Sequence, residues 1–229
     1  MKKAAKVLSR LNIQLQGTHE DLWAGLGALY PGVRARVNLA FGLLAEHYPK
    51  RETRDYEAAL LYLLAAQYDK PGAVIAEIGT CWGWTAAIMQ HAAPQARIMT
   101  CTPNPNHVII ARRNLAVHFP RVEVLDLKSV DWLPQIADNS LDMVFIDGDH
   151  QRVTDDLPFY NKLKVGGLKI HHDYCPDRPL CTGPRPCRWV YGAVNDFAAK
   201  MHAPDVLLVD YNREGMAGFY RREGELWHG

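Results

Sequence analysis

From residue 71 onward, short runs of β-branched and apolar residues alternate with stretches of helical periodicity, and this alternation constrains the fold more than any other feature. The runs that predict strands are 73–78, 97–101, 122–127, 142–147, 168–172, 205–209 and 215–220. Helical patterns between them span about 82–93, 105–118, 129–137 and 152–164. Strands that alternate with helices are typical of βαβ units and a parallel sheet. The sequence therefore predicts an α/β protein with a seven-stranded sheet.

The last two predicted strands should run in opposite directions. Only a short turn that contains Asn212, Arg213 and Glu214 joins them. A linker of this length cannot make the crossover that parallel neighbours need. We therefore expect the final strand to be antiparallel in the sheet.

The first seventy residues are predicted to be helical throughout and to form an N-terminal cap, 1–70, on a sheet domain, 71–229. Val7, Leu8, Leu11 and Leu15 share one helical face, and further helical patterns cover 33–48 and 56–68. The first, basic helix could lie on a membrane or cap a substrate pocket, but packing on the domain is the favoured interpretation. These helices are expected to shape the substrate side or a homodimer contact.

Composition narrows the class of partner. The chain has 26 Lys and Arg against 25 Asp and Glu, so nothing in its charge of +1 favours nucleic acid. Its longest apolar run, 58–66, is far shorter than the roughly 20 residues of a membrane span. No secretory signal is recognised at the N-terminus, and five cysteines, an odd number, suggest reduced thiols. We expect a cytoplasmic protein that acts on a small molecule, without nucleic-acid or membrane partners.

A first candidate site motif, Glu77-Ile78-Gly79-Thr80-Cys81-Trp82-Gly83, follows the first predicted sheet strand and opens a helix. Glycine permits a tight turn and close approach to a ligand, and free N–H groups at a helix start favour electron-rich atoms. Glu77 could accept hydrogen bonds from ribose hydroxyls or a ligand ammonium. A strand-to-helix turn without any ligand has the same pattern, so this motif alone decides nothing.

Two further polar clusters follow predicted strands. Asp147-Gly148-Asp149-His150 ends one apolar run, and His171-His172-Asp173-Tyr174 ends the run after Gly166 and Gly167, which we expect to form a helix-to-strand turn. If these strands are neighbours, Asp147 and Asp173 face one another and repel unless a cation or a shared proton intervenes. Oxygen ligands suit Mg²⁺ or Ca²⁺, and His150 is then placed as a general base. A turn stabilised by aspartates is the alternative.

Taken together, the motifs resemble those of class I S-adenosylmethionine-dependent methyltransferases. The likeness rests on Glu77-x-Gly79-Thr80-x-x-Gly83-x-Thr85, on Phe145-Ile146-Asp147-Gly148-Asp149-His150, and on Leu163-Lys164-x-Gly166-Gly167 running into His172-Asp173-Tyr174. The resemblance covers about residues 71–221. Within this class, the motifs are most similar to those of the catechol, caffeoyl-CoA and macrolide sugar O-methyltransferase group. The resemblance implies a Rossmann-like sheet in the strand order 3-2-1-4-5-7-6.

The resemblance also implies roles for individual residues. The implied S-adenosylmethionine-binding set is Glu77, Gly79, Thr80, Cys81, Gly83, Thr102, Ser129 and Asp147. The implied ligands of a divalent cation such as Mg²⁺ are Asp147, Asp173 and His172. His150 would deprotonate the acceptor hydroxyl, with Asp147 beside it as the second catalytic residue.

The sequence departs from the family pattern at two places. Relatives end the second strand with an acidic residue that binds the ribose, whereas 100–104 holds no carboxylate, and Thr102 or Asn104 would be a weaker partner. Tyr174 stands where metal-dependent relatives carry Asn, so that His172 or water would complete the ligands. A metal-free site stays an alternative.

Three of the five cysteines, Cys175, Cys181 and Cys187, lie in a proline-rich segment after the fifth predicted strand. Their spacing is poor for zinc, so a stiff lid over the site is favoured over a zinc site. Arg178, Arg185 and Arg188 could attract an anionic substrate there or simply be solvated. Trp82 and Trp84 are interpreted as core residues rather than cofactor contacts.

The sequence thus predicts a methyltransferase that moves a methyl group from S-adenosylmethionine to a small-molecule hydroxyl. The alternatives are a non-catalytic binding module that retains the fold, and an enzyme on the same fold that performs N-methyl or aminopropyl transfer.

Overall fold

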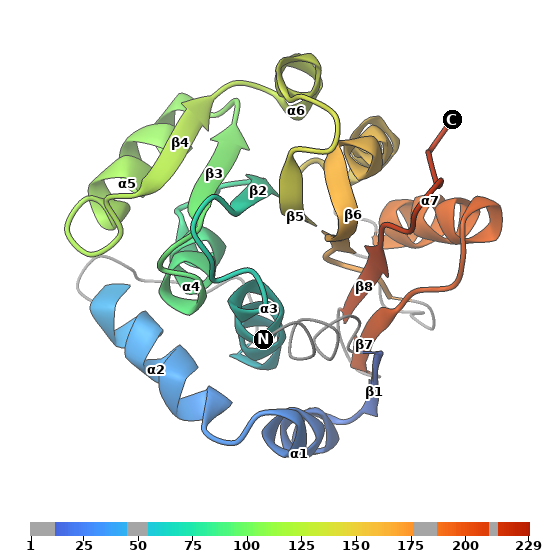
Figure 1. Cartoon of the computed structure of the whole chain (residues 1–229). Helices are drawn as coiled ribbons and strands as arrows, with labels where there is room; N and C mark the ends of the chain where they lie inside the picture. The colour runs from blue at the N-terminus through green and yellow to red at the C-terminus, as the bar shows by residue number, and fades with distance from the viewer. Residues whose placement is uncertain (1–11, 45–54, 176–186, 211–214) are drawn as a thin grey trace.

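A single mixed sheet of eight strands is the centre of the molecule (Figure 1). The computed structural model describes residues 12–44, 55–175, 187–210 and 215–229. The strands are β1 (Ile13–Gly17), β2 (Val74–Ile78), β3 (Arg97–Thr102), β4 (Val122–Asp126), β5 (Leu141–Ile146), β6 (Leu163–His171), β7 (Val206–Asp210) and β8 (Gly215–Tyr220). Their order across the sheet is β1-β7-β8-β6-β5-β2-β3-β4.

The seven strands expected from the sequence lie in the expected order. Strand β8 is antiparallel to both β6 and β7, as the short linker before it predicted. The expected count was wrong, because β1 adds an eighth strand at the edge of the sheet, parallel to β7.

Strand β1 also corrects the expectation that the first seventy residues are helical throughout. Its sequence, Ile13-Gln14-Leu15-Gln16, alternates apolar and polar residues with the period of a strand, and Ile13 is buried in the core. The other residues of the expected apolar face, Val7, Leu8 and Leu11, lie outside the described residues. The division of the chain at residue 70 stays a prediction.

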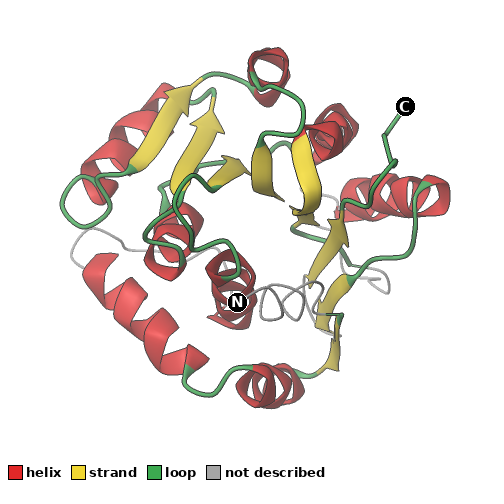
Figure 2. Cartoon of the chain, in the orientation of Figure 1, coloured by secondary structure: helices red, strands yellow, loops and turns green. Residues whose placement is uncertain are grey.

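Helices cover both faces of the sheet (Figure 2). They are α1 (His19–Leu29), α2 (Val33–Leu44), α3 (Asp55–Ala66), α4 (Trp84–Ala92), α5 (Pro105–Leu115), α6 (Ser129–Trp132), α7 (Cys187–Lys200) and the 3₁₀ segments η3 (Leu133–Gln135) and η4 (His150–Lys162). One hydrophobic core joins the first five helices to one face, and a second joins α6, η4 and α7 to the other. No helix in the described ranges is long and apolar enough to cross a membrane.

The central strands are buried on both faces, which is why their sequences are continuously apolar rather than alternating. In β5 all six residues are buried. Along β6, Leu168 and Ile170 face the first core, whereas the buried Lys169 lies over the ring of Phe197 in α7, on the opposite face.

Two local expectations for the segment before β6 were wrong. Gly166 and Gly167 do not form a helix-to-strand turn but lie inside β6, where the pairing with β5 shifts register. A side chain at Gly167 would approach the carbonyl oxygen of Asp142 to 2.9 Å, so the strands meet closely at this irregularity. The expected helix 152–164 is instead the 3₁₀ segment η4, which begins at His150 and contains Pro158.

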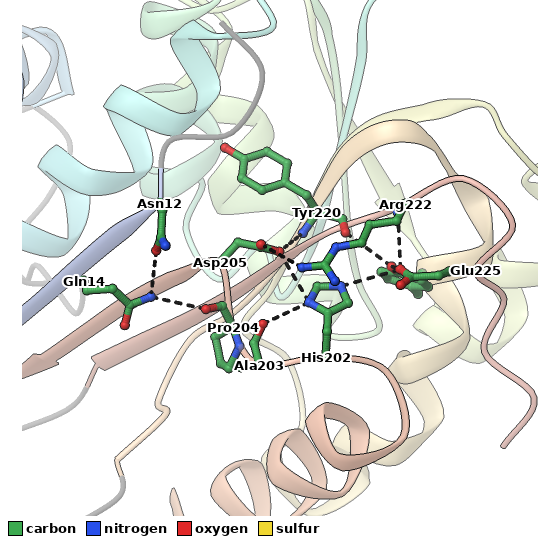
Figure 3. A network of polar contacts seen from close by, with 10 residues as sticks. Asn12, Gln14, His202, Ala203, Pro204, Asp205, Tyr220, Arg222 and Glu225 are labelled. Atoms are coloured by element: carbon green, nitrogen blue, oxygen red, sulfur yellow. Dashed lines mark hydrogen bonds and ion pairs between the residues drawn. The ribbon is translucent and has the colours of Figure 1, made fainter.

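A polar network fastens the edge of the sheet opposite to the carboxyl ends of the parallel strands (Figure 3). Asp205, just before β7, accepts hydrogen bonds from the backbone of Tyr220 at 2.9 Å and from the guanidinium of Arg222 at 3.3 Å. The imidazole of His202 lies between the carboxylates of Asp205 and Glu225. Gln14 of β1 donates to the carbonyl oxygen of Pro204 at 3.2 Å. The network therefore joins the C-terminal segment and β1 to the start of β7.

Asp142 provides a test of how β2, β5 and β6 are held together. Its carboxylate is buried and accepts hydrogen bonds from the backbone of Val74 at 3.0 Å and from Lys164, and it lies 3.0 Å from the ammonium of Lys70. Burial alone would raise the pKa of Asp142, but these donors hold it below its ordinary value.

We expect Asp142→Asn to lower the free energy of unfolding by about 2 kcal/mol at pH 7, measured by urea denaturation. Because the pKa is lower in the folded state, the difference from wild type should shrink as the pH falls through the range below 4. Asp138→Asn is the control, since its exposed carboxylate pairs with Lys162 at the surface and should contribute less than about 0.5 kcal/mol. Equal effects of the two substitutions would contradict the assignment.

Candidate active site

The candidate site lies at the carboxyl ends of the neighbouring strands β2 and β5. The strand order reverses between them, since the chain continues from β2 to β3 on one side and from β5 to β6 on the other. Open α/β sheets bind ligands at such a switch point, outside the carboxyl ends of the strands. Here the backbone of Asp147 donates a hydrogen bond to the carbonyl oxygen of Ile78 at 2.8 Å. Gly79 has a φ of +102°, and a Cβ atom there would lie 2.0 Å from the carbonyl oxygen of Asp147. Only glycine fits this contact.

The turn from β2 into α4 leaves helix N–H groups without a side-chain cap. Gly83, with a φ of +91°, is the N-cap residue of α4 and makes no capping hydrogen bond. Its N–H donates to the carbonyl oxygen of Thr80 at 2.7 Å, while Gly79 and Thr80 donate to the carbonyl oxygen of Cys101. Cys81 has a φ of +44°, which is unusual for a residue with a side chain and typical of constrained turns at sites.

Glu77 lies at the carboxyl end of β2 and is completely buried. Burial raises the pKa of Glu77 to about 8, although hydrogen bonds from Thr100 and Thr85 oppose the shift. The hydroxyl of Thr80 is 2.7 Å from that of Thr100, so its hydrogen bond is made within the protein.

A second cluster follows β5 and β6. Nε2 of His150 lies 2.7 Å from a carboxylate oxygen of Asp173 and 3.6 Å from one of Asp147. Nδ1 of His172 lies 3.3 Å from each of the same two carboxylates. The structure therefore brings together the four residues that the sequence predicted for the cation and the base.

The sequence did not single out Glu57, which completes this cluster from α3. Its carboxylate is fully buried and lies 3.2 Å from Nε2 of His172. Beside it, the hydroxyl of Tyr56 donates to Asp210, at the end of β7, at 2.7 Å. The available signal was an acidic residue at the start of the apolar run 58–66, but sequence alone does not show which strand that helix covers.

Comparison with known proteins accounts for this arrangement. Residues 76–174 match a protein family described as "Methyltransferase domain". This stretch contains Glu77, the turn of residues 79–83 (the glycine turn) and all of the cluster after β5 and β6 except Glu57. Over these residues the chain is similar to a methyltransferase domain.

Individual relatives support the assignment. A Catechol O-methyltransferase from Mycobacterium tuberculosis (strain ATCC 25618 / H37Rv) is 40% identical over 80 residues, which are 34% of this chain and 36% of the relative. The match thus spans about a third of that relative's length. Among solved structures, cofactor-bound Rv0187 from MTB has a TM-score of 0.67 at 22% identity, covering 89% of this chain and 97% of its own. An O-methyltransferase from Bacillus cereus in complex with SAH has a TM-score of 0.63 at 21% identity, covering 89% and 98%.

These matches confirm the resemblance to class I methyltransferases and the Rossmann-like α/β fold. At the carboxyl end of β3, residues 100–104 hold no carboxylate. Thr102 is nearly buried and its hydroxyl accepts a hydrogen bond from the N–H of Asn104 at 3.4 Å. Ser129 forms a hydrogen bond with the carboxylate of Asp156. The expected cofactor roles of both hydroxyls stay predictions.

The electrostatics of the cluster favour protonated histidines. Hydrogen bonds to Asp147 and Asp173 raise the pKa of His150 to about 10, against the effect of burial. Burial opposes a charge on His172, but Asp147, Asp173 and Glu57 outweigh it and raise its pKa. The same imidazoles lower the pKa of Asp147 and of Asp173. In this arrangement His150 carries a proton at neutral pH, so its expected role as a base requires the carboxylates to be engaged by another cation.

The residues fit a divalent cation. Ligand atoms of Asp147, His150 and Asp173 lie within 4.8 Å of one another, and the nearly buried His172 adds a nitrogen beside both carboxylates. Tyr174, the departure from the family pattern, donates its hydroxyl to Asn195 at 3.2 Å. His172, and not Tyr174, thus lies beside both carboxylates, and its role as a ligand stays a prediction.

Other expected features are partly outside the described residues. The lid segment, with Cys181, Arg178 and Arg185, lies there. Cys175 is buried after β6, and Cys187 is the first residue of α7. Trp84 is buried in the first core with Trp82 packed against it, which confirms their interpretation as core residues.

Glu77 yields a test of its unusual environment. The pKa of Glu77 is about 8 in the folded protein and close to 4.5 when the side chain is exposed. At a pH between these two values, the carboxylate therefore takes up a proton when the protein folds. We expect the wild type to lose stability relative to Glu77→Gln as the pH rises from about 5 to 8, by on the order of 3 kcal/mol.

Urea unfolding of the cofactor-free protein at a series of pH values measures this difference. Glu123→Gln is the control, since Glu123 is an exposed strand residue paired with Arg97. Superimposable pH profiles of wild type and Glu77→Gln would show that Glu77 ionises normally.

Proposed function

We propose that this protein transfers a methyl group from S-adenosylmethionine to a hydroxyl of a small-molecule acceptor, with a divalent cation at the Asp147 cluster. The proposal rests on one observation above all: Asp147 belongs to both halves of the site. Its backbone closes against Gly79 in the glycine turn, and its side chain lies among His150, His172 and Asp173.

This junction fits the chemistry of methyl transfer. The reaction is a displacement at a carbon bound to sulfur, so the protein must chiefly align the acceptor oxygen with the methyl carbon. The N-terminus of α4, which follows the turn 79–83 and has no side-chain cap, would offer backbone N–H groups to the methyl donor. The carboxylates and imidazoles beyond Asp147 offer acid and base groups to a hydroxyl at the adjacent position.

The cation has a defined role in this proposal. A cation held by Asp147 and Asp173 supplies positive charge that lowers the pKa of a bound hydroxyl. Carboxylates engaged in this way hold the proton of His150 less tightly, which leaves its imidazole able to accept one. His150 is the more exposed of the two histidines, with 18% of its side chain accessible against 6% for His172. Because an acceptor can reach it more easily, His150 is the better placed base.

The names of the relatives support an O-methyltransferase, and a catechol is a reasonable first acceptor because a curated relative carries that name. N-methyl or aminopropyl transfer and a non-catalytic binding module are the competing functions. The contact between the N-terminal helices of two copies, expected from the sequence, stays a prediction.

The first experiment measures cofactor binding by calorimetry and turnover by the mass of methylated catechol. We expect S-adenosylmethionine and S-adenosylhomocysteine to bind, and His150→Ala to lower turnover by about 10²- to 10⁴-fold with cofactor affinity nearly unchanged. His118→Ala, at an exposed position after α5, is the matched control and should behave as wild type.

The outcomes separate the alternatives. No binding at millimolar cofactor would refute a methyltransferase and favour a non-catalytic module. An equal loss of turnover and cofactor affinity in His150→Ala would show that His150 is structural. If cofactor binds and catechol is not methylated, product analysis with amine acceptors tests the N-methyl alternative.

A further inference from the structure

We propose that the cation site is a mixed nitrogen–oxygen site, in which Asp147, Asp173 and Nδ1 of His172 are the ligands and Glu57 is the residue that positions His172. This donor set selects a transition metal such as Co²⁺, Zn²⁺ or Mn²⁺ over the Mg²⁺ expected from the sequence. The inference rests on the proposed function and specifies the cation of the same site.

His172 is placed as a ligand rather than as a surface base. Its side chain is 6% exposed, and the edge of its ring packs on Phe145, with ring centroids 6.0 Å apart. Its backbone N–H donates to the carbonyl oxygen of Ile146 at 3.0 Å, which fixes the residue beside β5. Within the described chain neither ring nitrogen makes a hydrogen bond of good geometry, although Nδ1 lies 3.3 Å from both Asp147 and Asp173. A buried imidazole with Nδ1 beside two carboxylates is suited to share a cation with them.

Glu57 distinguishes His172 from His150. A carboxylate 3.2 Å from Nε2 favours the imidazole tautomer with its proton on Nε2, which leaves the Nδ1 lone pair for a metal. Ligating histidines in proteins usually have such a carboxylate or carbonyl on the far nitrogen. Glu57 is completely buried, and the hydrogen bond from Tyr56 to Asp210 holds the start of α3 over the sheet. His150, in contrast, contacts Asp147 and Asp173 through Nε2.

The donor types decide the class of cation. Mg²⁺ prefers oxygen ligands and keeps much of its water, whereas imidazole nitrogen suits zinc and the neighbouring first-row metals. For a site with nitrogen donors, affinity rises from Mn²⁺ through Co²⁺. Two carboxylates with one braced imidazole therefore bind Co²⁺ or Zn²⁺ more tightly than Mg²⁺.

The test titrates the full-length, metal-free protein with Co²⁺, Zn²⁺, Mn²⁺ or Mg²⁺ by calorimetry, with neither cofactor nor acceptor present. Visible absorption of the Co²⁺ form reports directly on nitrogen ligation. We expect Co²⁺ to bind at least tenfold more tightly than Mg²⁺. Glu57→Gln, which keeps the shape of the side chain, should weaken Co²⁺ by about 10- to 100-fold and alter its absorption. Its effect on Mg²⁺ should be less than threefold.

A second variant keeps the inference testable if Glu57→Gln does not fold. His172→Asn replaces the imidazole by an amide and should remove the preference for Co²⁺ over Mg²⁺. Glu123→Gln is the control and should bind each metal as wild type does, since Glu123 lies at an exposed position of β4.

Tighter binding of Mg²⁺ than of Co²⁺, or unchanged Co²⁺ binding in both Glu57→Gln and His172→Asn, would overturn the inference. A larger loss of Co²⁺ affinity in His150→Ala than in His172→Asn would also overturn it, by assigning the ligand to His150. None of these results refutes methyl transfer, which is judged separately by cofactor binding and product mass.

Discussion

The close approach of Gly79 to the backbone of Asp147 is the contact on which the rest of the site depends. It is available because β2 and β5 are neighbours in the sheet although 60 or more residues of chain separate them, and because position 79 has no side chain. Through this contact the glycine turn and the polar cluster are held at a fixed distance by backbone atoms. A site built on backbone contacts between buried strands is rigid, and rigidity is what an alignment-dependent reaction requires.

Much of this arrangement could be predicted from the sequence, because its causes are local. The alternation of strands and helices determines a parallel sheet, and the carboxyl ends of its strands share one edge. The clusters at Glu77, Asp147 and Asp173 could therefore be expected near one another, and the structure brings them together. The short linker before residue 215 likewise predicted the antiparallel final strand.

The features that could not be predicted have tertiary causes. Residues 13–17 alternate with strand period, but only the open edge of β7 determines that they form a strand there. Gly166 and Gly167 have the composition of a turn, yet backbone hydrogen bonds with Arg221, the residue after β8, keep them in β6. Glu57 lies in the first turn of a helix that is apolar from residue 58 onward, and its role follows from the packing of that helix over His172.

The position of β1 has a consequence for how the chain folds. Its five residues pair with Val206–Asp210, so nearly two hundred residues must be synthesised before the first described strand has a partner. During synthesis β1 stays unpaired while β2 to β6, whose contacts are closer in sequence, form first. The first described strand is thus among the last to join the sheet, and its docking covers an edge of β7 that would otherwise be exposed to pairing with other molecules.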